Sequence, residues 1–204
     1  MKVRLAENIS EITLEQFQNY SKLVERKDLD EYQFNKRKVS IFTGIKYKDL
    51  DNINQLDFVD ILTQIDLSLN VDAEFKPRFE MGGVEFGFIP NFDKMTTKEF
   101  VDLSLYPVSD VETYHKLMAI LFRPIKNKDT FGNYKLKNYN GTEKYAELMK
   151  QTPMNIVNGA LVFFCNLANE LQQSTKRYIQ EELKKAEKQV TTLKSGDGTV
   201  QLNE

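Results

Sequence analysis

Cysteine and histidine are almost missing from the chain, which has one of each among its 204 residues. A single cysteine cannot form a disulfide within the chain, and its scarcity fits a reducing compartment. Structural zinc sites use sets of four Cys or His ligands, so the usual zinc-binding classes are excluded. We therefore expect neither a metal ion nor a cofactor.

An excess of charge of one sign is missing as well. The chain has 28 Lys and Arg residues against 30 Asp and Glu residues, a formal net charge of -2. A chain so close to neutral is not built around a large basic footprint for nucleic acid. Hydrophobic residues at 41 % and charged residues at 28 % suffice for a core and exclude a disordered chain. The length suits one domain with an appendage.

Long hydrophobic runs are also absent. The first ten residues lack the apolar core of about seven or more residues that a signal peptide needs. The most apolar stretch, residues 154–171, contains four asparagines, whereas a bilayer-spanning helix needs about 20 mostly apolar residues. We therefore expect a protein of the cytoplasmic type that does not contact a membrane.

Signatures of common active sites do not occur. No Gly-rich run ends in Lys-Ser or Lys-Thr as in a P-loop, and no Ser lies between spaced glycines as in a nucleophile elbow. His115 lies within a predicted helix, and Cys165 lies in the apolar run LVFFCNL, a setting that disfavours the reactive thiolate. We predict that the protein is not an enzyme. An acid–base enzyme of an unrecognised kind is the alternative.

Three helices are predicted in the first seventy residues, over residues 13–26, 30–42 and 55–69. Thr13 followed by Gln16 is a capping-box pattern at the start of the first helix. Gly44 matches the residue that commonly ends a helix. The third helix is predicted to be half-buried because its apolar residues recur every three or four positions. These residues are Leu56, Val59, Leu62, Ile65 and Leu69.

The hydrophobic period changes in residues 75–88, which read FKPRFEMGGVEFGF. Gly82 and Gly83 suit a two-residue turn in which both residues need positive φ. Counting outward from this turn places three apolar pairs on one face. The pairs are Met81 with Val84, Phe79 with Phe86, and Pro77 with Phe88. The sequence therefore predicts one antiparallel hairpin at about residues 74–89, with Pro77 on an edge strand.

Helical patterns resume after the hairpin. Capping-box patterns at Thr96 and Ser109 predict a short helix and a second one that ends at Arg123-Pro124. Further segments are a loop or weak second hairpin at 125–140, a short helix at 142–150, and a long C-terminal helix from Pro153 to Lys194. The fold class is α+β, mainly α. We expect one domain over residues 1–171 with the hairpin inserted, a polar helical extension at 172–194, and a flexible tail at 195–204.

One segment offers a local interface for nucleic acid. Residues 123–139 read RPIKNKDTFGNYKLKNY and have one acidic residue, Asp129. Basic residues bind phosphates and aromatic rings stack on bases. The basic residues are Arg123, Lys126, Lys128, Lys135 and Lys137, interleaved with Phe131, Tyr134 and Tyr139. The alternative interpretation is a solvated loop whose aromatic rings pack inward.

The polar half of the predicted C-terminal helix carries a narrow apolar stripe. Its residues are spaced by four, three, four and three positions: Ile179, Leu183, Ala186, Val190 and Leu193. This spacing is that of a coiled-coil seam, but it covers only about two heptads, fewer than the three or four that identify a coiled coil. We predict that these five residues contact a partner. Ordinary packing within the chain is the alternative.

Several longer stretches resemble a set of short proteins of tailed bacteriophages, including crAss-like phages of gut Bacteroidetes. These stretches are GVEFGFIPNFDKMTTKEFVDL, HKLMAILFRPI and GTEKYAELMKQTPMNIVNGALVFFCNLANEL, with a late GDG. The resemblance covers roughly residues 83–198, and the N-terminal third is similar only in its SEITLEQFQ opening. The resemblance implies no catalytic residues for this chain.

The resemblance implies a viral protein of the virion assembly module. Such a protein acts through protein–protein contacts, either as a structural protein of the tail, neck or capsid, or as a tail-assembly chaperone. The expected partners are other phage structural proteins or further copies of the same chain. The expected location is the host bacterial cytoplasm during assembly and, for a structural component, the virion. A nucleic-acid-binding accessory protein that uses residues 123–139 is the alternative.

Overall fold

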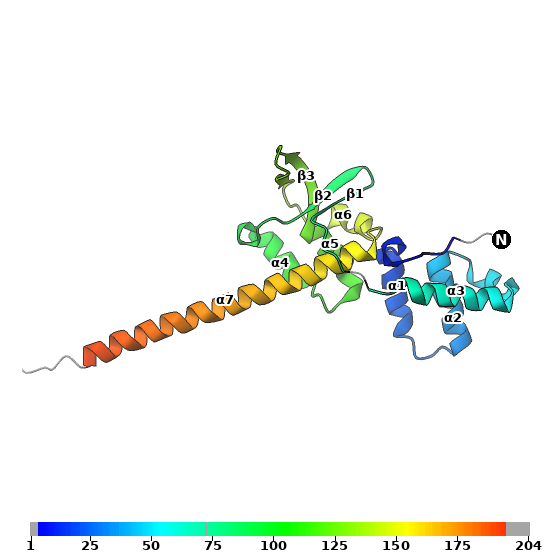
Figure 1. Cartoon of the computed structure of the whole chain (residues 1–204), viewed down its shortest axis with the longest axis horizontal. Helices are drawn as coiled ribbons and strands as arrows, with labels where there is room; N and C mark the ends of the chain where they lie inside the picture. Colours follow the sequence, from blue (N-terminus) through cyan, green and yellow to red (C-terminus); the bar gives the residue numbers. More distant parts are fainter. Residues whose placement is uncertain (1–3, 72, 195–204) are drawn as a thin grey trace, which may run out of the picture. The chain divides into compact units, whose positions relative to one another are not determined.

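The computed structural model describes residues 4–71 and 73–194, with the side chains of residues 93, 171, 172, 174, 175, 178, 182 and 185–194 excepted. The expected tail at 195–204 lies outside the described residues. By its internal contacts the chain divides into two units, Met1–Val162 and Phe163–Glu204. The described strands, and the described helices except part of α7, belong to the first unit (Figure 1).

The first seventy residues form the predicted cluster of three helices, α1 (Leu14–Val24), α2 (Glu31–Thr43) and α3 (Gln55–Ser68). The capping box is present at α1. Thr13 Oγ1 accepts a hydrogen bond from the Gln16 backbone N–H at 3.2 Å, and Gln16 Oε1 accepts one from the Thr13 backbone N–H at 3.0 Å. At the end of α2, Gly44 adopts φ 74°, the left-handed conformation in which a glycine has no steric penalty.

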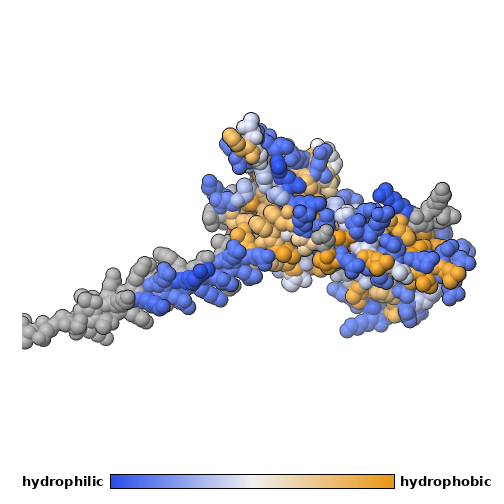
Figure 2. Space-filling view, in the orientation of Figure 1, coloured by the Kyte–Doolittle hydropathy of each residue, from blue (hydrophilic) through white to orange (hydrophobic). Residues whose placement is uncertain are grey.

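The predicted buried face of α3 is partly wrong. Ile65 is buried as expected, but Leu56 is 74 % exposed and Val59 is 50 % exposed. The buried residues of α3 are Ile65, which was predicted, and Ile61 and Ser68, which were not. Because α3 is apolar on two sides, its period fits either side equally well and cannot select the one that packs inward. Figure 2 shows the apolar residues that this leaves at the surface of the helical cluster.

The predicted hairpin is present as β1 (Arg78–Met81) and β2 (Val84–Phe88). Its register is the predicted one, with Phe79 opposite Phe86 and Met81 opposite Val84. The Phe88 backbone N–H donates to the Pro77 carbonyl at 2.9 Å. β1 is an edge strand, where a proline without an N–H donor is tolerated.

The hairpin belongs to a larger sheet, which corrects the prediction of a single hairpin. The strands β3 (Phe122–Lys128) and β4 (Tyr134–Leu136) extend it into a four-stranded antiparallel sheet of order β1-β2-β3-β4. β3 begins where a helix was expected to continue to Arg123-Pro124. The preceding helix ends at Leu121 because the next residues pair with β2, Phe122 opposite Phe88 and Pro124 opposite Phe86. The second hairpin at 125–140, one of two alternatives for that segment, is the one observed.

The remaining helices are α4 (Thr97–Leu105), α5 (Tyr114–Leu121), α6 (Glu143–Met149) and α7 (Met154–Lys194). Short 3-10 turns lie at Ile9–Glu11, Tyr47–Asn52, Phe92–Lys94 and Val111–Thr113. The last of these is capped by Asp110, not by Ser109 as expected. The start of α7 is tied to the N-terminal segment, since the Met154 N–H donates to the Ile12 carbonyl at 2.9 Å. The Leu14 N–H also donates to the carbonyl of Thr152, just before the helix, at 2.9 Å.

The sheet and helices α5 to α7 contribute many of the buried side chains of the first unit. Phe86 and Phe122 from the sheet are fully buried, as are Leu117, Met149 and Met154 from the helices. Phe79 packs edge-on against Phe122 with ring centroids 4.9 Å apart. Among the described helices, none combines the length and apolar character that crossing a membrane would require.

Candidate functional site

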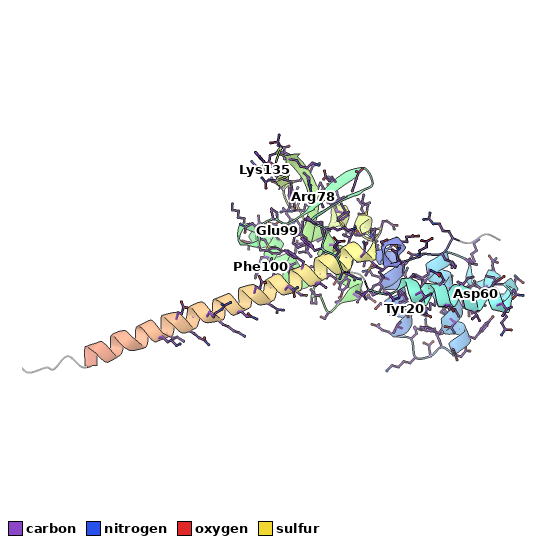
Figure 3. The ribbon with its side chains drawn as sticks, viewed as in Figure 1. Tyr20, Asp60, Arg78, Glu99, Phe100 and Lys135 are labelled. Atoms are coloured by element: carbon purple, nitrogen blue, oxygen red, sulfur yellow. The ribbon has the colours of Figure 1, made fainter. Side chains whose placement is uncertain are left out.

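Two pockets meet beside strands β3 and β4, toward the β4 edge of the sheet. The smaller has a volume of about 320 Å³ and the larger of about 620 Å³. They share a wall made by Arg123, Lys137, Asn138, Tyr139 and Asn140. Glu99 and Lys135, which line the larger pocket, are labelled in Figure 3. We refer to the two together as the basic pockets.

Cationic side chains predominate in the lining. Those of the two pockets together are Lys94, Arg123, Lys126, Lys135, Lys137 and Lys144. The acidic residue among the described lining is Glu99, in the larger pocket. A concave surface lined by charge of one sign concentrates ligands of the opposite sign. The basic pockets therefore favour anions, although the chain as a whole has a net charge of -2.

The fold brings these cations together from separate segments. β3 carries Arg123 and Lys126, and Lys137 follows β4 directly. The Lys137 backbone N–H donates to the Pro124 carbonyl at 2.9 Å, which holds this residue beside β3. Lys144 belongs to α6, and its Nζ lies 5.3 Å from the centroid of the Tyr145 ring.

Arg123 is held by a buried carboxylate. Its Nη1 lies 2.8 Å from Glu99 Oε1, and the two side chains are 16 % and 2 % exposed. The other oxygen, Glu99 Oε2, accepts from the backbone N–H and the hydroxyl of Thr96 at 2.6 and 2.7 Å. The capping box of α4 thus fixes the carboxylate, and the carboxylate fixes the guanidinium.

Arg123 retains hydrogen-bonding capacity. Its contact with Glu99 has the distance of an ion pair, but neither Glu99 Oε1 nor the buried Arg123 Nε has a hydrogen-bond partner of good geometry among the described residues. Burial lowers the pKa of Arg123, and the Glu99 carboxylate opposes that shift. A guanidinium stays charged even so, and it has five N–H donors. Arg123 is therefore an oriented cation whose Nε is enclosed and whose Nη donors are not all used by Glu99.

Two tyrosines that line the larger pocket are held by hydrogen bonds. The Tyr139 hydroxyl donates to Asp102 Oδ2 at 2.7 Å, and burial together with this carboxylate raises the pKa of Tyr139 well above its usual range. The hydroxyl therefore stays protonated and the hydrogen bond persists at physiological pH. The Tyr134 hydroxyl donates to the Phe88 carbonyl at 2.8 Å and so ties β4 to β2.

Four of the five basic residues predicted to contact nucleic acid line the basic pockets: Arg123, Lys126, Lys135 and Lys137. The fifth, Lys128, instead pairs with Glu85 at 2.5 Å. The predicted aromatic residues separate, because Tyr134 and Tyr139 line the larger pocket whereas Phe131 is 89 % exposed. Lys94 and Lys144 were missed by sequence reasoning, since no local pattern links them to residues 123–139.

The residues predicted to contact a partner lie on α7. Ile179 and Leu183, one helical turn apart, are 52 % and 59 % exposed. The side chains of the other three, Ala186, Val190 and Leu193, lie outside the described ones. Their role in a contact stays a prediction.

A second apolar surface lies on α3. Leu56, Val59 and Leu67 are 74 %, 50 % and 57 % exposed. At about 100° per residue these positions fall on one side of the helix, opposite the side that packs on α2. We call these three residues the outer face of α3. Asp57 and Asp60 beside them are also exposed, so the face has an acidic rim.

The two residues weighed as catalytic candidates, His115 and Cys165, lie on α5 and α7. His115 Nδ1 lies 3.1 Å from Gln18 Nε2, and burial is the main cause that lowers its pKa. Cys165 is a free thiol and is half-buried, whereas its apolar sequence context favours a buried thiol. Among the described residues, no group of three or more His, Cys, Asp or Glu side chains is arranged to hold a metal ion.

Comparison of the chain with protein-family models, curated proteins and solved structures gave no match.

Proposed function

We propose that the protein is a non-enzymatic bacteriophage protein that acts in virion morphogenesis through protein–protein contacts. Its partners are other phage structural proteins or further copies of itself, met in the host bacterial cytoplasm during assembly. It is either a component of the tail, neck or capsid or a tail-assembly chaperone. The phage context comes from the resemblance of residues 83–198, and the outer face of α3 is the observation that carries the contact function.

The outer face of α3 supports a contact because a helix with two apolar sides normally has both of them covered. Within the described residues, the side that the chain covers is the one with Ile61 and Ile65. Contiguous exposed apolar residues with a polar rim are typical of protein-interaction surfaces. Burying Leu56 and Leu67 would contribute about 1.5–3 kcal/mol for each side chain before ordering costs.

The test compares surface leucines of similar exposure. The double variant Leu56→Asp, Leu67→Asp should abolish capture of phage structural proteins by the tagged chain. Its melting temperature should lie within about 2 °C of the wild-type value, because substitutions at exposed positions usually change stability little. Leu183→Asp tests the α7 stripe in the same way. Leu105→Asp is the control, because Leu105 is 61 % exposed on α4 and belongs to neither surface.

The contact function is refuted if the α3 and α7 variants capture the same proteins as the wild type. Mass spectrometry of purified particles then separates the two roles, since a chaperone is absent from mature virions and a structural component remains. His115→Ala and Cys165→Ala should leave phage production unchanged apart from any loss of stability. Loss of production by either variant with fold and stability retained would instead indicate catalysis.

Nucleic-acid binding is the second candidate function, and the basic pockets are the observation that favours it. Neutralising Lys126, Lys128, Lys135 and Lys137 should weaken such binding and flatten its dependence on salt. If the contact function is the whole role, we expect no measurable nucleic acid binding at physiological salt, because the chain has a net charge of -2. Micromolar affinity that falls steeply with added salt would favour this candidate over the first.

A further inference from the structure

We propose that the basic pockets form a binding site for a phosphate group, with Arg123 at its centre. The group belongs to a nucleotide or to the sugar-phosphate backbone of a single nucleic acid strand. This inference goes beyond the contact function and does not depend on it. It also differs from a flat interface along residues 123–139, because its ligand is held in a concave site that includes Lys144 from α6.

The charge in the smaller pocket exceeds what the chain itself neutralises. Arg123, Lys126, Lys137 and Lys144 line it, and its described lining contains no carboxylate. None of the three lysines forms an ion pair with a carboxylate in the part of the chain that the structure describes. The three lysines are exposed, so solvent screens their mutual repulsion, but with Arg123 they give the pocket a positive potential. Such a potential favours a ligand with several negative charges.

Arg123 has the features of a built binding residue. Its guanidinium is mostly buried, it is held by Glu99 at 2.8 Å, and it lies in the wall between the two pockets. Its Nε is enclosed by the protein, and only the Nη1 group lies against Glu99. A guanidinium carries two N–H donors on each Nη atom, and such donors match phosphate oxygens. A bound phosphate would therefore accept from the Nη donors that Glu99 leaves unused.

Phosphate fits better than a carboxylate side chain of a protein partner. A terminal phosphate of a nucleotide carries about 1.5–2 negative charges at pH 7 and three acceptor oxygens, whereas a carboxylate carries one charge. A nucleic acid strand carries one charge on each phosphate, and successive phosphates supply several charges to one site. Asn138 and Asn140 add amide donors to the shared wall. The smaller pocket, at about 320 Å³, is within the size range of small-ligand sites. Tyr139 and Tyr145 also line it and supply aromatic surface for a base.

The first experiment measures binding of three probes to the full chain: pyrophosphate, ATP and a fluorescently labelled 12-nucleotide oligothymidylate. The triple variant Lys126→Gln, Lys137→Gln, Lys144→Gln should bind at least about tenfold more weakly than the wild type, with an unchanged melting temperature. For the oligonucleotide it should also flatten the slope of log affinity against log salt by about 0.7 for each phosphate that the variant no longer neutralises.

The matched control removes the same charge elsewhere. Lys27→Gln, Lys46→Gln, Lys48→Gln changes three exposed lysines of the N-terminal cluster that have no ion pair among the described residues. This variant should bind each probe within about twofold of the wild type. Equal weakening by the two triple variants would mean that only the net charge matters, and it would overturn the site.

Two single variants separate binding by Arg123 from a purely structural role. Glu99→Gln keeps the capping box but removes the competing negative charge, so it should tighten binding several-fold even if it lowers the melting temperature. Arg123→Lys keeps the ion pair but loses the paired donors, so it should weaken binding about tenfold. If Arg123 only stabilises Glu99, both variants change stability and neither changes affinity.

The probes also identify the source of the phosphate. Binding of ATP and pyrophosphate, weakened in the lysine triple variant, assigns the site to a nucleotide. Binding of the oligonucleotide alone, with the same loss in that variant, assigns it to a nucleic acid strand. Failure of all three probes to bind overturns the proposal. So does binding of a polyglutamate peptide with an affinity equal to that of the oligonucleotide, because the site would then recognise acidic chains in general.

Discussion

Replacing Gly87 by alanine tests how the sheet positions β4 and the wall of the larger pocket. Gly87 lies on β2, and a Cβ added there would be 2.5 Å from Cε2 of the Tyr134 ring and 3.0 Å from its Cδ2 and Cζ. Real Cβ contacts essentially never fall below 3.0 Å. The ring cannot swing away freely, because its hydroxyl donates to the Phe88 carbonyl at 2.8 Å. Gly87 has no positive φ, so the clash alone opposes the substitution.

The expected cost follows from that clash. Forcing one extra carbon into a packed site typically costs about 1–3 kcal/mol. Losing the Tyr134 hydrogen bond would add about 0.5–1.5 kcal/mol. For a chain of this size each kcal/mol lowers the melting temperature by about 2–4 °C. Gly87→Ala should therefore lower the free energy of unfolding by at least about 1 kcal/mol and displace β4.

A double-mutant cycle in urea isolates the interaction between the two residues. In the Tyr134→Ala background, Gly87→Ala should cost less than about 0.5 kcal/mol, because the methyl group then meets no ring. The coupling free energy should be about 1–3 kcal/mol, within the range known for residues in contact. If Gly87→Ala costs the same in both backgrounds, the ring is not what excludes a side chain at this position, and the reasoning is wrong.

Three further predictions concern stability. Gly159→Ala should lower the free energy of unfolding in urea by more than about 2 kcal/mol, because the added Cβ would lie 2.7 Å from the carbonyl carbon of Glu74. Backbone atoms cannot rotate aside as a side chain can. A loss below about 0.5 kcal/mol would contradict that close approach. Thr13→Ala should cost about 1 kcal/mol by removing the N-cap of α1, and Thr13→Ser should restore most of it. Burial, and after it the positive charge of Lys150, lowers the pKa of His115 in the folded chain. Below about pH 6.5 the unfolded chain therefore binds more protons at this residue than the folded chain does. Stability should therefore fall as the pH drops below that value, and the His115→Gln variant should lose this part of the pH dependence; an unchanged profile would show that His115 does not contribute to it.

The sequence by itself determined the local features of the fold. The capping boxes at Thr13 and Thr96 and the turn at Gly82-Gly83 form where expected, because each depends on residues within a few positions of one another. The register of the first hairpin follows from its two-residue turn for the same reason. The α+β class, mainly α, was predicted correctly because helical periods and one strand period are readable in single segments.

Tertiary structure decided what depends on segments far apart in the chain. Residues 122–128 became β3 because β2, more than thirty positions earlier, offers an edge to pair with. The core selected one of the two apolar sides of α3, and the period of the segment by itself does not identify that side. The basic pockets combine cations that precede α4, lie on β3 and β4, and belong to α6, so only the folded chain concentrates them. Coulomb interactions depend on distance in space and not on distance along the chain. A chain of nearly neutral composition can therefore have a basic site where the fold brings its cations together.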